Sequence, residues 1–154
     1  MEVPLPQDFK EFLALLNSAR IEYLVVGGYA VSFYGYPRPT GDLDIWIAIH
    51  PDNAEKLVAA LIQFGFSGAE TAKELFLKPG QIVRMGVPPV RIEVLNSISG
   101  VDFDACHARR VNAVLDGVEV SIIARDDLMT NKQAAGREKD LNDLKHLRQR
   151  REAP

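Results

Sequence analysis

The sequence predicts an α+β, α/β-like domain in which helices pack on one side of a mixed β-sheet. Apolar residues recur at helical spacing in several segments and at strand spacing in others, and the two kinds of segment interleave along the chain. The dipeptide Asp116-Gly117 separates two strand-like runs and is typical of a hairpin turn. Antiparallel pairing is therefore expected alongside the alternation of strands and helices.

The first half of the chain alternates helical and strand-like segments. The N-terminal helix is expected to bury Phe9 and Phe12 on one face, with Asp8 as its N-cap, and a later helix to be capped by the pair Asp52/Asn53. In chain order, the elements are a helix over 8–20, a strand over 22–28, a helix over 28–35, a loop over 36–41, a strand over 43–49 and a helix over 51–66.

The second half begins with three strand-like runs that are separated by Pro/Gly turns. A short helix, the hairpin and two further helices follow. In chain order, these are strands over 74–80, 81–86 and 90–97, a helix over 102–110, the hairpin over 110–123, and helices over 125–136 and 137–151.

The bulk properties predict a single cytoplasmic domain over 1–154, with its C-terminal helices beginning near residue 125. The formal net charge of −3 creates no global positive field that would collect nucleic acid. The single cysteine excludes an internal disulfide, and the N-terminal residues resemble no signal peptide. No apolar stretch approaches the ~20 residues that span a membrane, so no membrane association is expected.

The first functional candidate is Gly27-Gly28, which lies where a predicted strand turns into a helix. Without side chains, the backbone can approach a ligand closely, and the free N–H groups of a helix start favour anions, phosphates above all. The same pair also suits a tight strand-to-helix turn that binds nothing. The glycines gain their meaning from the residues that follow them.

The second candidate is the pair Asp42 and Asp44, which opens the apolar stretch LDIWIAI. Residues i and i+2 of a strand point to the same face, so the two carboxylates aim together while Leu43 and Ile45 point into the core. Paired carboxylates are hard oxygen ligands that suit Mg²⁺ or Mn²⁺. Two like charges beside a buried strand cost free energy unless a cation lies between them, which favours a metal site over a solvated strand end.

A third acid is expected to join these candidates in one cleft. The spacer between Gly28 and Asp42 accommodates a short helix and a return loop, so the second strand can lie beside the first. In the run VRIEVLNS, alternation places Arg91, Glu93 and Leu95 on one face. If this run pairs with the aspartate strand, Glu93 completes a triad that can hold two metal ions for phosphoryl transfer. Otherwise Glu93 is one half of a surface cross-strand pair.

Together, VVGGYAVSFYGYPRPTGDLDIWI and RIEVL resemble the pattern of the nucleotidyltransferase superfamily: a glycine pair, a spacer, D-x-[DE] and a later acid on a neighbouring strand. The late segment LMTNKQAAGREKDLNDLKHL is similar to the C-terminal pattern of small bacterial members, including the nucleotidyltransferase toxins of type IV toxin–antitoxin systems. The resemblance covers Tyr23 to Leu147. It implies the DNA polymerase β-like nucleotidyltransferase fold.

The resemblance also implies roles for the residues of the front motif. Gly27 and Gly28 would hold the nucleotide phosphates. Thr40 would hydrogen-bond a phosphate or cap the turn, and Asp42 and Asp44 would bind the catalytic metals.

The later residues receive their roles in the same way. Glu93 stands where an aspartate is more usual, and would bind metal and activate the acceptor hydroxyl. Lys132 would contact the triphosphate, and Arg137 would help to balance charge. Asp140 would orient the lysine or the acceptor.

The activity that the resemblance implies is transfer of a nucleoside monophosphate from ATP or another NTP to a hydroxyl, with release of pyrophosphate and with Mg²⁺ or Mn²⁺ as cofactor. The protein would supply positioning and charge neutralisation rather than a covalent nucleophile. The acceptor can be RNA, a protein or a small molecule, and an antitoxin or another partner protein is a candidate binding partner. The alternative is a catalytically silent nucleotide-binding or partner-binding module of the same fold. The presence of every acid and of the glycine pair favours the enzyme.

The remaining chemistry-bearing residues predict less. The three histidines lack ligand spacing, so no zinc site is expected, and Cys106 is expected to be a small buried residue. Trp46 lies on the aspartate side of its strand, where it either stacks on a base or packs beneath a helix. The aspartates open the apolar strand rather than close it, which argues against a haloacid-dehalogenase-type phosphatase. The chain is also short for a sugar-nucleotide glycosyltransferase.

Overall fold

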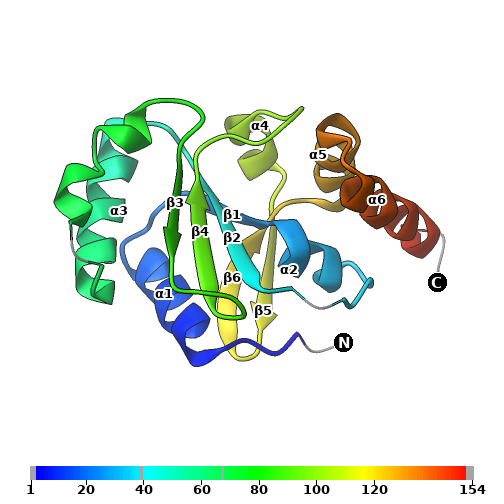
Figure 1. Cartoon of the computed structure of the whole chain (residues 1–154), viewed down its shortest axis with the longest axis horizontal. Coiled ribbons are helices and arrows are strands. Elements are labelled where there is room, and N and C mark those ends of the chain that lie inside the picture. The colour runs from blue at the N-terminus through cyan, green and yellow to red at the C-terminus, as the bar shows by residue number, and fades with distance from the viewer. Residues whose placement is uncertain (1–2, 39, 67, 152–154) are drawn as a thin grey trace.

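The computed structural model describes residues 3–38, 40–66 and 68–151, which form a mixed sheet of six strands with helices around it (Figure 1). The strand order is β3-β4-β2-β1-β6-β5. The strands are β1 (Tyr23–Val26), β2 (Asp42–Ile47), β3 (Ile82–Met85), β4 (Arg91–Leu95), β5 (Val111–Leu115) and β6 (Val118–Ile122). The helices are α1 (Gln7–Ser18), α2 (Gly27–Phe33), α3 (Pro51–Phe64), α4 (Phe103–Ala108), α5 (Arg125–Ala135) and α6 (Glu138–Arg151). The predicted α+β class with a mixed sheet is confirmed.

The register of the central strands decides which side chains share a face. Strand β1 runs antiparallel to β2 and places Val26 opposite Asp44. Strand β4 runs parallel to β2 and places Arg91 beside Asp42 and Glu93 beside Asp44. Because side chains that are paired across a sheet point to the same side, the three acids project from one face. The strand pairing on which the role of Glu93 depended is therefore confirmed.

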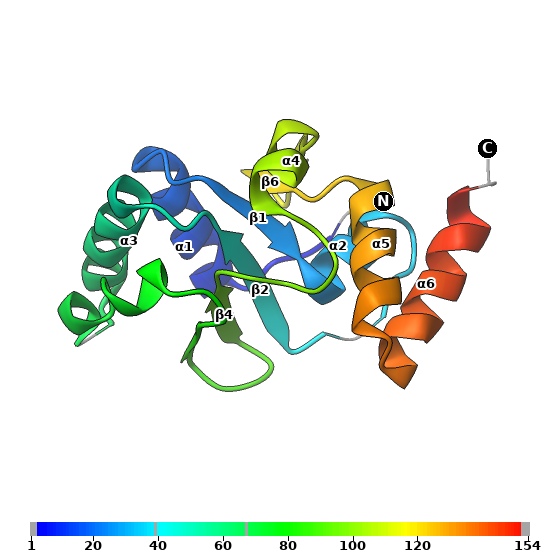
Figure 2. The same ribbon diagram turned by 90° about the horizontal axis from the view of Figure 1, so that it is seen from above.

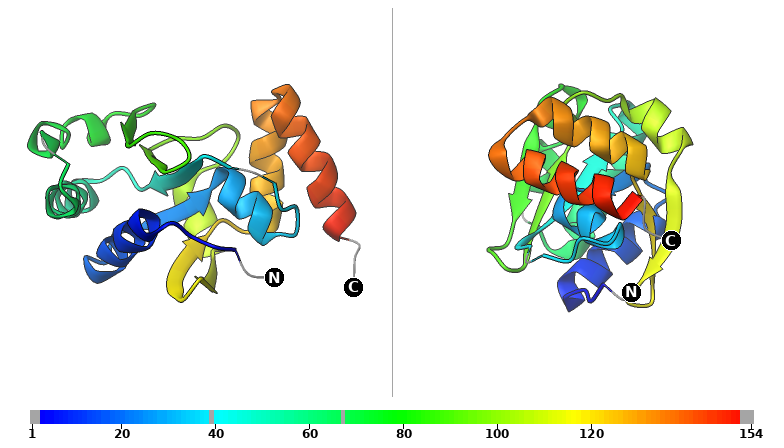
Figure 3. Two further views of the ribbon diagram at one scale, coloured as in Figure 1. Left: turned by 60° about the horizontal axis from the view of Figure 1, so that its bottom comes forward. Right: turned by 90° about the vertical axis from the view of Figure 1, so that its right-hand side faces the viewer.

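Helices lie against both faces of the sheet, whereas the sequence predicted one. On the face opposite the acids, the Tyr23 hydroxyl donates to Asn17 Oδ1 of α1 at 2.8 Å. On the acid face, Trp46 packs edge-on against Phe103 of α4, with ring centroids 5.1 Å apart. Helices α5 and α6 lie side by side at one end of the molecule, away from α3 (Figures 2 and 3).

The core is centred on β1, which is buried along its whole length because the sheet and both helical layers surround it. Phe9 and Phe12 of α1 are fully buried beneath the sheet, as the helical spacing predicts. No helix in the described ranges is long and apolar enough to cross a bilayer.

Both predicted helix caps are wrong. Helix α1 begins at Gln7 after Pro6, so Asp8 lies inside the first turn and does not cap it. Helix α3 is capped by His50, whose Nδ1 accepts the Asn53 N–H at 3.2 Å. The Asn53 side chain instead bonds backbone groups of Glu22 and Ala48 and fastens the helix to the sheet.

The strand predicted over 74–80 is also wrong. These residues contain a 3₁₀ turn, η2 (Leu75–Leu77), which follows a similar turn, η1 (Ala69–Thr71). Phe76 is fully buried while Leu75 is 43% exposed, so the segment covers the core with one side chain and forms no ladder. An apolar run this short predicts a strand or a buried turn equally well.

Candidate active site

The glycine pair lies against the aspartate strand. Gly27 and Gly28 open α2 directly after β1, and Gly27 has a φ of +68°. A Cβ at Gly27 would overlap the Asp44 carboxylate, and a Cβ at Gly28 would overlap Thr40. The Thr40 hydroxyl donates to the Asp42 carbonyl at 3.2 Å and so closes the turn that enters β2. Only glycine allows the backbone to lie this close to both residues.

The residues Asp42, Asp44 and Glu93, called the acid cluster below, bring one carboxylate oxygen each to within 4.8 Å of one another. In the described ranges this is the only group of three or more His, Cys, Asp or Glu residues with such spacing. The side chains of Asp42 and Glu93 are 28% and 13% exposed, so the cluster is partly shielded from water. Convergent carboxylates at this spacing are suited to a divalent cation.

Asp44 is the member of the acid cluster with the least compensation. Its Oδ1 is buried and has no hydrogen-bond partner among the described residues. Burial, followed by the nearby charges of Glu93 and Asp42, raises the pKa of Asp44 to about 7. A buried carboxylate oxygen without a partner, beside two further hard oxygen ligands, fits Mg²⁺ or Mn²⁺. The residues present therefore suit the metal that the sequence led us to expect.

Two arginines neutralise the other members of the cluster. Arg91 donates from Nε and Nη2 to the two oxygens of Asp42 at 2.8 and 2.9 Å, and its Nη2 lies 3.2 Å from Glu93 Oε1. Arg84 of β3 donates to the same Glu93 oxygen at 3.0 Å. The hydrogen bonds that Arg91 makes with Asp42 raise the pKa of Arg91. Alternation along β4 placed Arg91 on the face of Glu93, but the pairing with Asp42 depends on the strand register.

A second group of charges, called the helix network below, ties α5 and α6 to the loop before β2. Its members are Arg38, Lys132, Arg137, Asp140 and Asp143. Arg38 binds Asp143 through two hydrogen bonds of 2.8 Å. The Lys132 ammonium lies 3.2 Å from Asp140 Oδ1 and 3.1 Å from Asp143 Oδ2, and Arg137 Nε donates to Asp140 Oδ2 at 2.6 Å.

The helix network compensates its acids fully. Both carboxylates are about 1% exposed. Burial alone would raise the pKa of Asp140, but the hydrogen bond from Arg137 and the charge of Lys132 outweigh it, so the pKa is lowered. Lys132 is itself buried and shared between two carboxylates. Lys139 is exposed on the first turn of α6 and has no ion-pair partner within 4.0 Å in the described part of the chain.

One cleft of about 530 Å³ gathers the acid cluster, the glycine pair and part of the helix network. It is lined by every site residue that the sequence singled out: Gly27, Gly28, Thr40, Asp42, Asp44, Glu93, Lys132, Arg137 and Asp140. Four cations that sequence reasoning left without a role also line it: Arg38, Arg84, Arg91 and Lys139. Their common signal is positive charge on segments that flank the motifs, but which of them faces the cleft depends on the fold.

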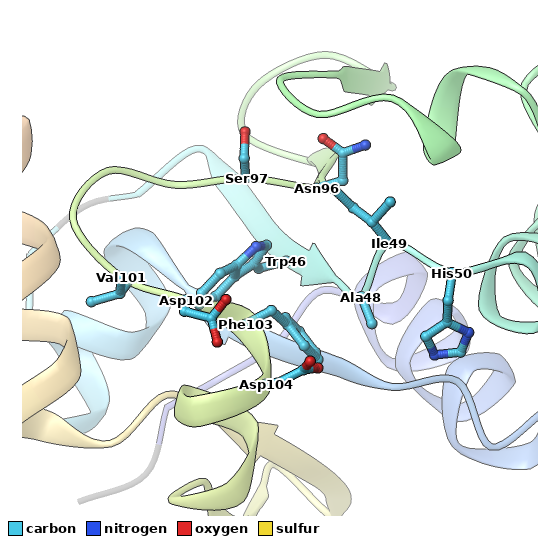
Figure 4. Close-up of a pocket in the computed structure, with 10 residues that line it drawn as sticks. All are labelled: Trp46, Ala48, Ile49, His50, Asn96, Ser97, Val101, Asp102, Phe103 and Asp104. Carbon is cyan, nitrogen blue, oxygen red and sulfur yellow. The ribbon is translucent and has the colours of Figure 1, made fainter.

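Trp46 lies outside this cleft and follows the second of its two predicted fates. It is 2% exposed, packs on Phe103, and lines a neighbouring pocket of about 400 Å³ (Figure 4). Ser97 lines both cavities, so the loop that leaves β4 separates them. The indole Nε1 is buried without a hydrogen-bond partner among the described residues.

Cys106 agrees with the sequence, and each of the three histidines lies against a neighbouring side chain. Cys106 is buried, and burial together with the charge of Asp127 raises the pKa of its thiol to about 11. His50 Nε2 lies 2.6 Å from Glu22 Oε2 and His107 is stacked on Phe103, while His146 is stacked on Tyr36. No described group of histidines has the spacing of a metal site.

The mixed sheet, the aspartate pair that opens β2 and the acid on the parallel neighbour β4 define a nucleotidyltransferase-type domain. Residues 6–153 match the family described as nucleotidyl transferase of unknown function (DUF2204), and the chain belongs to that family. A search of curated protein sequences gave no significant match. Among solved structures, the chain is similar to an antigenic nucleotidyltransferase-like protein from Paracoccidioides brasiliensis, with 18% identity and a TM-score of 0.49. The similarity covers 94% of this chain and 78% of that one.

Proposed function

We propose that the chain is a metal-dependent nucleotidyltransferase that moves a nucleoside monophosphate from an NTP to a hydroxyl group. The acceptor oxygen attacks the α-phosphorus, and the bond from that phosphorus to the oxygen bridging the β-phosphate breaks. Pyrophosphate leaves, and the acceptor proton passes to Glu93. When bound, Mg²⁺ or Mn²⁺ supplies positive charge to the reacting phosphate oxygens.

The residues of the cleft divide the work of this reaction. Asp42, Asp44 and Glu93 would hold the divalent cation through their convergent oxygens. Gly27 and Gly28 would present backbone N–H groups to the triphosphate beside the acids, because glycine lets the start of α2 lie directly against Asp44 and Thr40. The chain thereby positions and neutralises its substrates and forms no covalent intermediate.

The cationic side chains of α5 and α6 would hold the phosphates that leave. Arg137 and Lys139 line the cleft and are exposed, so they can reach a triphosphate directly. Lys132 would contribute its positive charge without contacting the phosphates, since its ammonium is already held by Asp140 and Asp143. Thr40 would support the site by closing the turn before Asp42.

The observation that carries the proposal is the incomplete compensation of Asp44. A silent module gains nothing from a buried carboxylate oxygen that lacks a partner among the described residues, or from a pKa raised to about 7. An enzyme gains a strong ligand for a cation that arrives with its substrate. This asymmetry favours the enzyme over the catalytically silent nucleotide-binding or partner-binding module.

The acceptor belongs to the proposal only as a class: a hydroxyl of RNA, of a protein or of a small molecule. Exposed Arg137 and Lys139 line the cleft, so an acceptor can be presented there by a partner protein. A toxin that works together with an antitoxin is one example of an enzyme that depends on a partner protein. It would use the same nucleotidyl transfer.

The test is labelling with each α-³²P NTP in Mg²⁺ or Mn²⁺, with total cellular RNA or lysate protein as acceptor. The Asp42→Asn/Asp44→Asn double variant is compared with Asp52→Asn, which removes an exposed acid from α3 outside the cleft. We expect label with the wild type and with Asp52→Asn, and none with the double variant. Equal labelling by the double variant would exclude the acid cluster as the catalytic site.

Thermal stability with Mg²⁺ and each NTP provides the second measurement. Binding to the folded state at a hundredfold excess over Kd stabilises by about 2.7 kcal/mol. Stabilisation without labelling would indicate that the acceptor or partner is missing. The absence of both would support the silent module.

A further inference from the structure

The cation that balances most of the acid cluster is Arg91, and the sheet holds it in place. Arg91 is the Cα partner of Asp42 in the parallel register of β2 and β4. Its guanidinium contacts both Asp42 oxygens and lies 3.2 Å from Glu93. A two-pronged guanidinium–carboxylate contact is the strongest geometry that such a pair adopts.

This guanidinium and a divalent cation require the same carboxylates. The oxygens of Asp42, Asp44 and Glu93 that could ligate a metal lie within 4.8 Å of one another, and Arg91 contacts two of these three residues. A divalent cation among them would lie close to the guanidinium, and positive charges in a partly buried site repel strongly. Metal binding and the Arg91–Asp42 pair therefore oppose each other.

We infer that Arg91 is an internal competitor of the divalent cation. The Arg91 guanidinium binds Asp42 in the metal-free protein and leaves Asp42 when the metal binds. The inference rests on the proposed function and names a regulation of the same site. The Arg91 side chain is 30% exposed and lines the cleft, so the guanidinium can move without crossing the core. A nucleotide triphosphate would give it a new anionic partner there. Metal alone is then bound weakly, and metal and nucleotide are bound in support of each other.

Arg84 offers a matched control within the same sheet. It carries the same charge, lies on the same face, and donates to the same Glu93 oxygen at 3.0 Å. Its side chain is 56% exposed, and no ion pair between Arg84 and Asp42 occurs in the described part of the chain. Arg84→Gln therefore removes one nearby positive charge without freeing Asp42. The difference between Arg91→Gln and Arg84→Gln isolates the competition.

The experiment is a titration of the EDTA-stripped, nucleotide-free protein with Mn²⁺ alone, with free Mn²⁺ measured by electron paramagnetic resonance. We expect Arg91→Gln to lower the Kd for Mn²⁺ by about tenfold or more, and Arg84→Gln to lower it by less than about threefold. Asp42→Asn should bind more weakly than the wild type, because it removes a ligand. Thermal unfolding without metal should show Arg91→Gln less stable than the wild type, and Mn²⁺ should restore it.

Several outcomes would overturn the inference. Equal shifts in Arg91→Gln and Arg84→Gln would reduce the effect to general electrostatics, and weaker binding by Arg91→Gln would make Arg91 a support of the metal site. In both cases the proposed function would stand. Failure of the wild type and Arg91→Gln alike to bind millimolar Mn²⁺ would remove the metal site and the proposed function together.

A second variant, Arg91→Lys, tests the inference if Arg91→Gln does not fold. Arg91→Lys keeps the charge but loses the two-pronged contact. If Arg91→Gln fails to fold, at least about threefold tighter Mn²⁺ binding by Arg91→Lys supports the competition, and an unchanged Kd contradicts it.

Discussion

The acid cluster and the helix network contribute to the same cleft, yet their charges are balanced in opposite ways. The acid cluster has three carboxylates and two guanidiniums, those of Arg84 and Arg91. It leaves a buried oxygen of Asp44 without a hydrogen-bond partner in the part of the chain that the structure describes. The helix network has two carboxylates and three cations, and both carboxylates hold at least two of those cations. Exposed Lys139 adds further positive charge on the network's side of the cleft.

The difference separates charge that serves the fold from charge that serves a ligand. A compensated buried network fixes the positions of the helices. The loss of one partner leaves a charge uncompensated in a low-dielectric environment. A buried acid without a partner weakens the fold unless a cation arrives. One side of the cleft is thus short of positive charge and the other is short of negative charge. A divalent cation with a polyphosphate supplies both.

The largest effect should follow from breaking the network at Lys132. Lys132→Met removes the cation shared by Asp140 and Asp143, and we expect a loss of about 3–5 kcal/mol in the free energy of unfolding. Urea unfolding measures this loss. Lys139→Met removes an exposed lysine from the same helical pair and should change the free energy by no more than about 0.5 kcal/mol. Equal losses in the two variants would mean that the buried pairing contributes little to stability.

The acid cluster should respond with the opposite sign. Asp44→Asn removes a carboxylate whose pKa is raised to about 7, so the metal-free variant should be more stable than the wild type at pH 8. The folded protein binds this proton more tightly than the unfolded chain, whose aspartate pKa is about 4, so the wild type loses stability as pH rises from about 4 to 7. The expected difference at pH 8 is roughly 2–4 kcal/mol, and it should shrink toward pH 5.

Urea unfolding in EDTA at pH 5 and pH 8 measures this difference, with Asp52→Asn as the exposed control. Mn²⁺ should then reverse the order, because it stabilises the wild type and not Asp44→Asn. A variant that is less stable than the wild type at both pH values would show that Asp44 is compensated in solution.

Sequence patterns predicted which acids share a face within each strand, because that information is local, whereas the pairing that brings Glu93 beside Asp44 was a condition that only the fold could meet. Alternation along one strand aligns Asp42 with Asp44, and alternation along another aligns Arg91 with Glu93. The compensation of those acids is not local. The contact between Arg91 and Asp42 requires the parallel register of two strands, and its partners are 49 residues apart in the chain.

The helix network shows the same limit more strongly. Lys132, Arg137 and Asp140 fall within one motif, and the sequence singled out all three. Arg38 and Asp143 are 105 residues apart, and the sequence did not predict their contact because no local pattern links the two residues. Caps and short apolar runs failed for a related reason: at His50 and Phe76, tertiary contacts rather than local propensity decide the structure.

A smaller effect should follow from adding a methyl group at the junction of glycine and acid. Gly27→Ala combines a φ of +68° with overlap of the new Cβ and the Asp44 carboxylate, and should cost about 2–3 kcal/mol in stability. Gly117→Ala has a φ of +84° with open space around its Cβ, and should cost only the backbone strain of about 1 kcal/mol. Thermal unfolding and Mn²⁺ binding are measured for both. Only Gly27→Ala should weaken Mn²⁺ binding, and intact binding there would separate the glycine from the acid cluster.

The smallest change in stability is expected at Arg137, whose side chain is more exposed than those of its four partners in the helix network. The Arg137 side chain is 66% exposed, and Asp140 keeps its contacts with Lys132 and with the Arg137 backbone N–H when the guanidinium is lost. Arg137→Gln should therefore lower the free energy of unfolding by about 0.5–1 kcal/mol, as an exposed ion pair does. Because Arg137 also lines the cleft, the same variant should lose much more of the thermal stabilisation that Mg²⁺ and an NTP provide. If Arg137→Gln lost as much unfolding free energy as Lys132→Met and kept its stabilisation by nucleotide, Arg137 would serve the fold and not nucleotide binding.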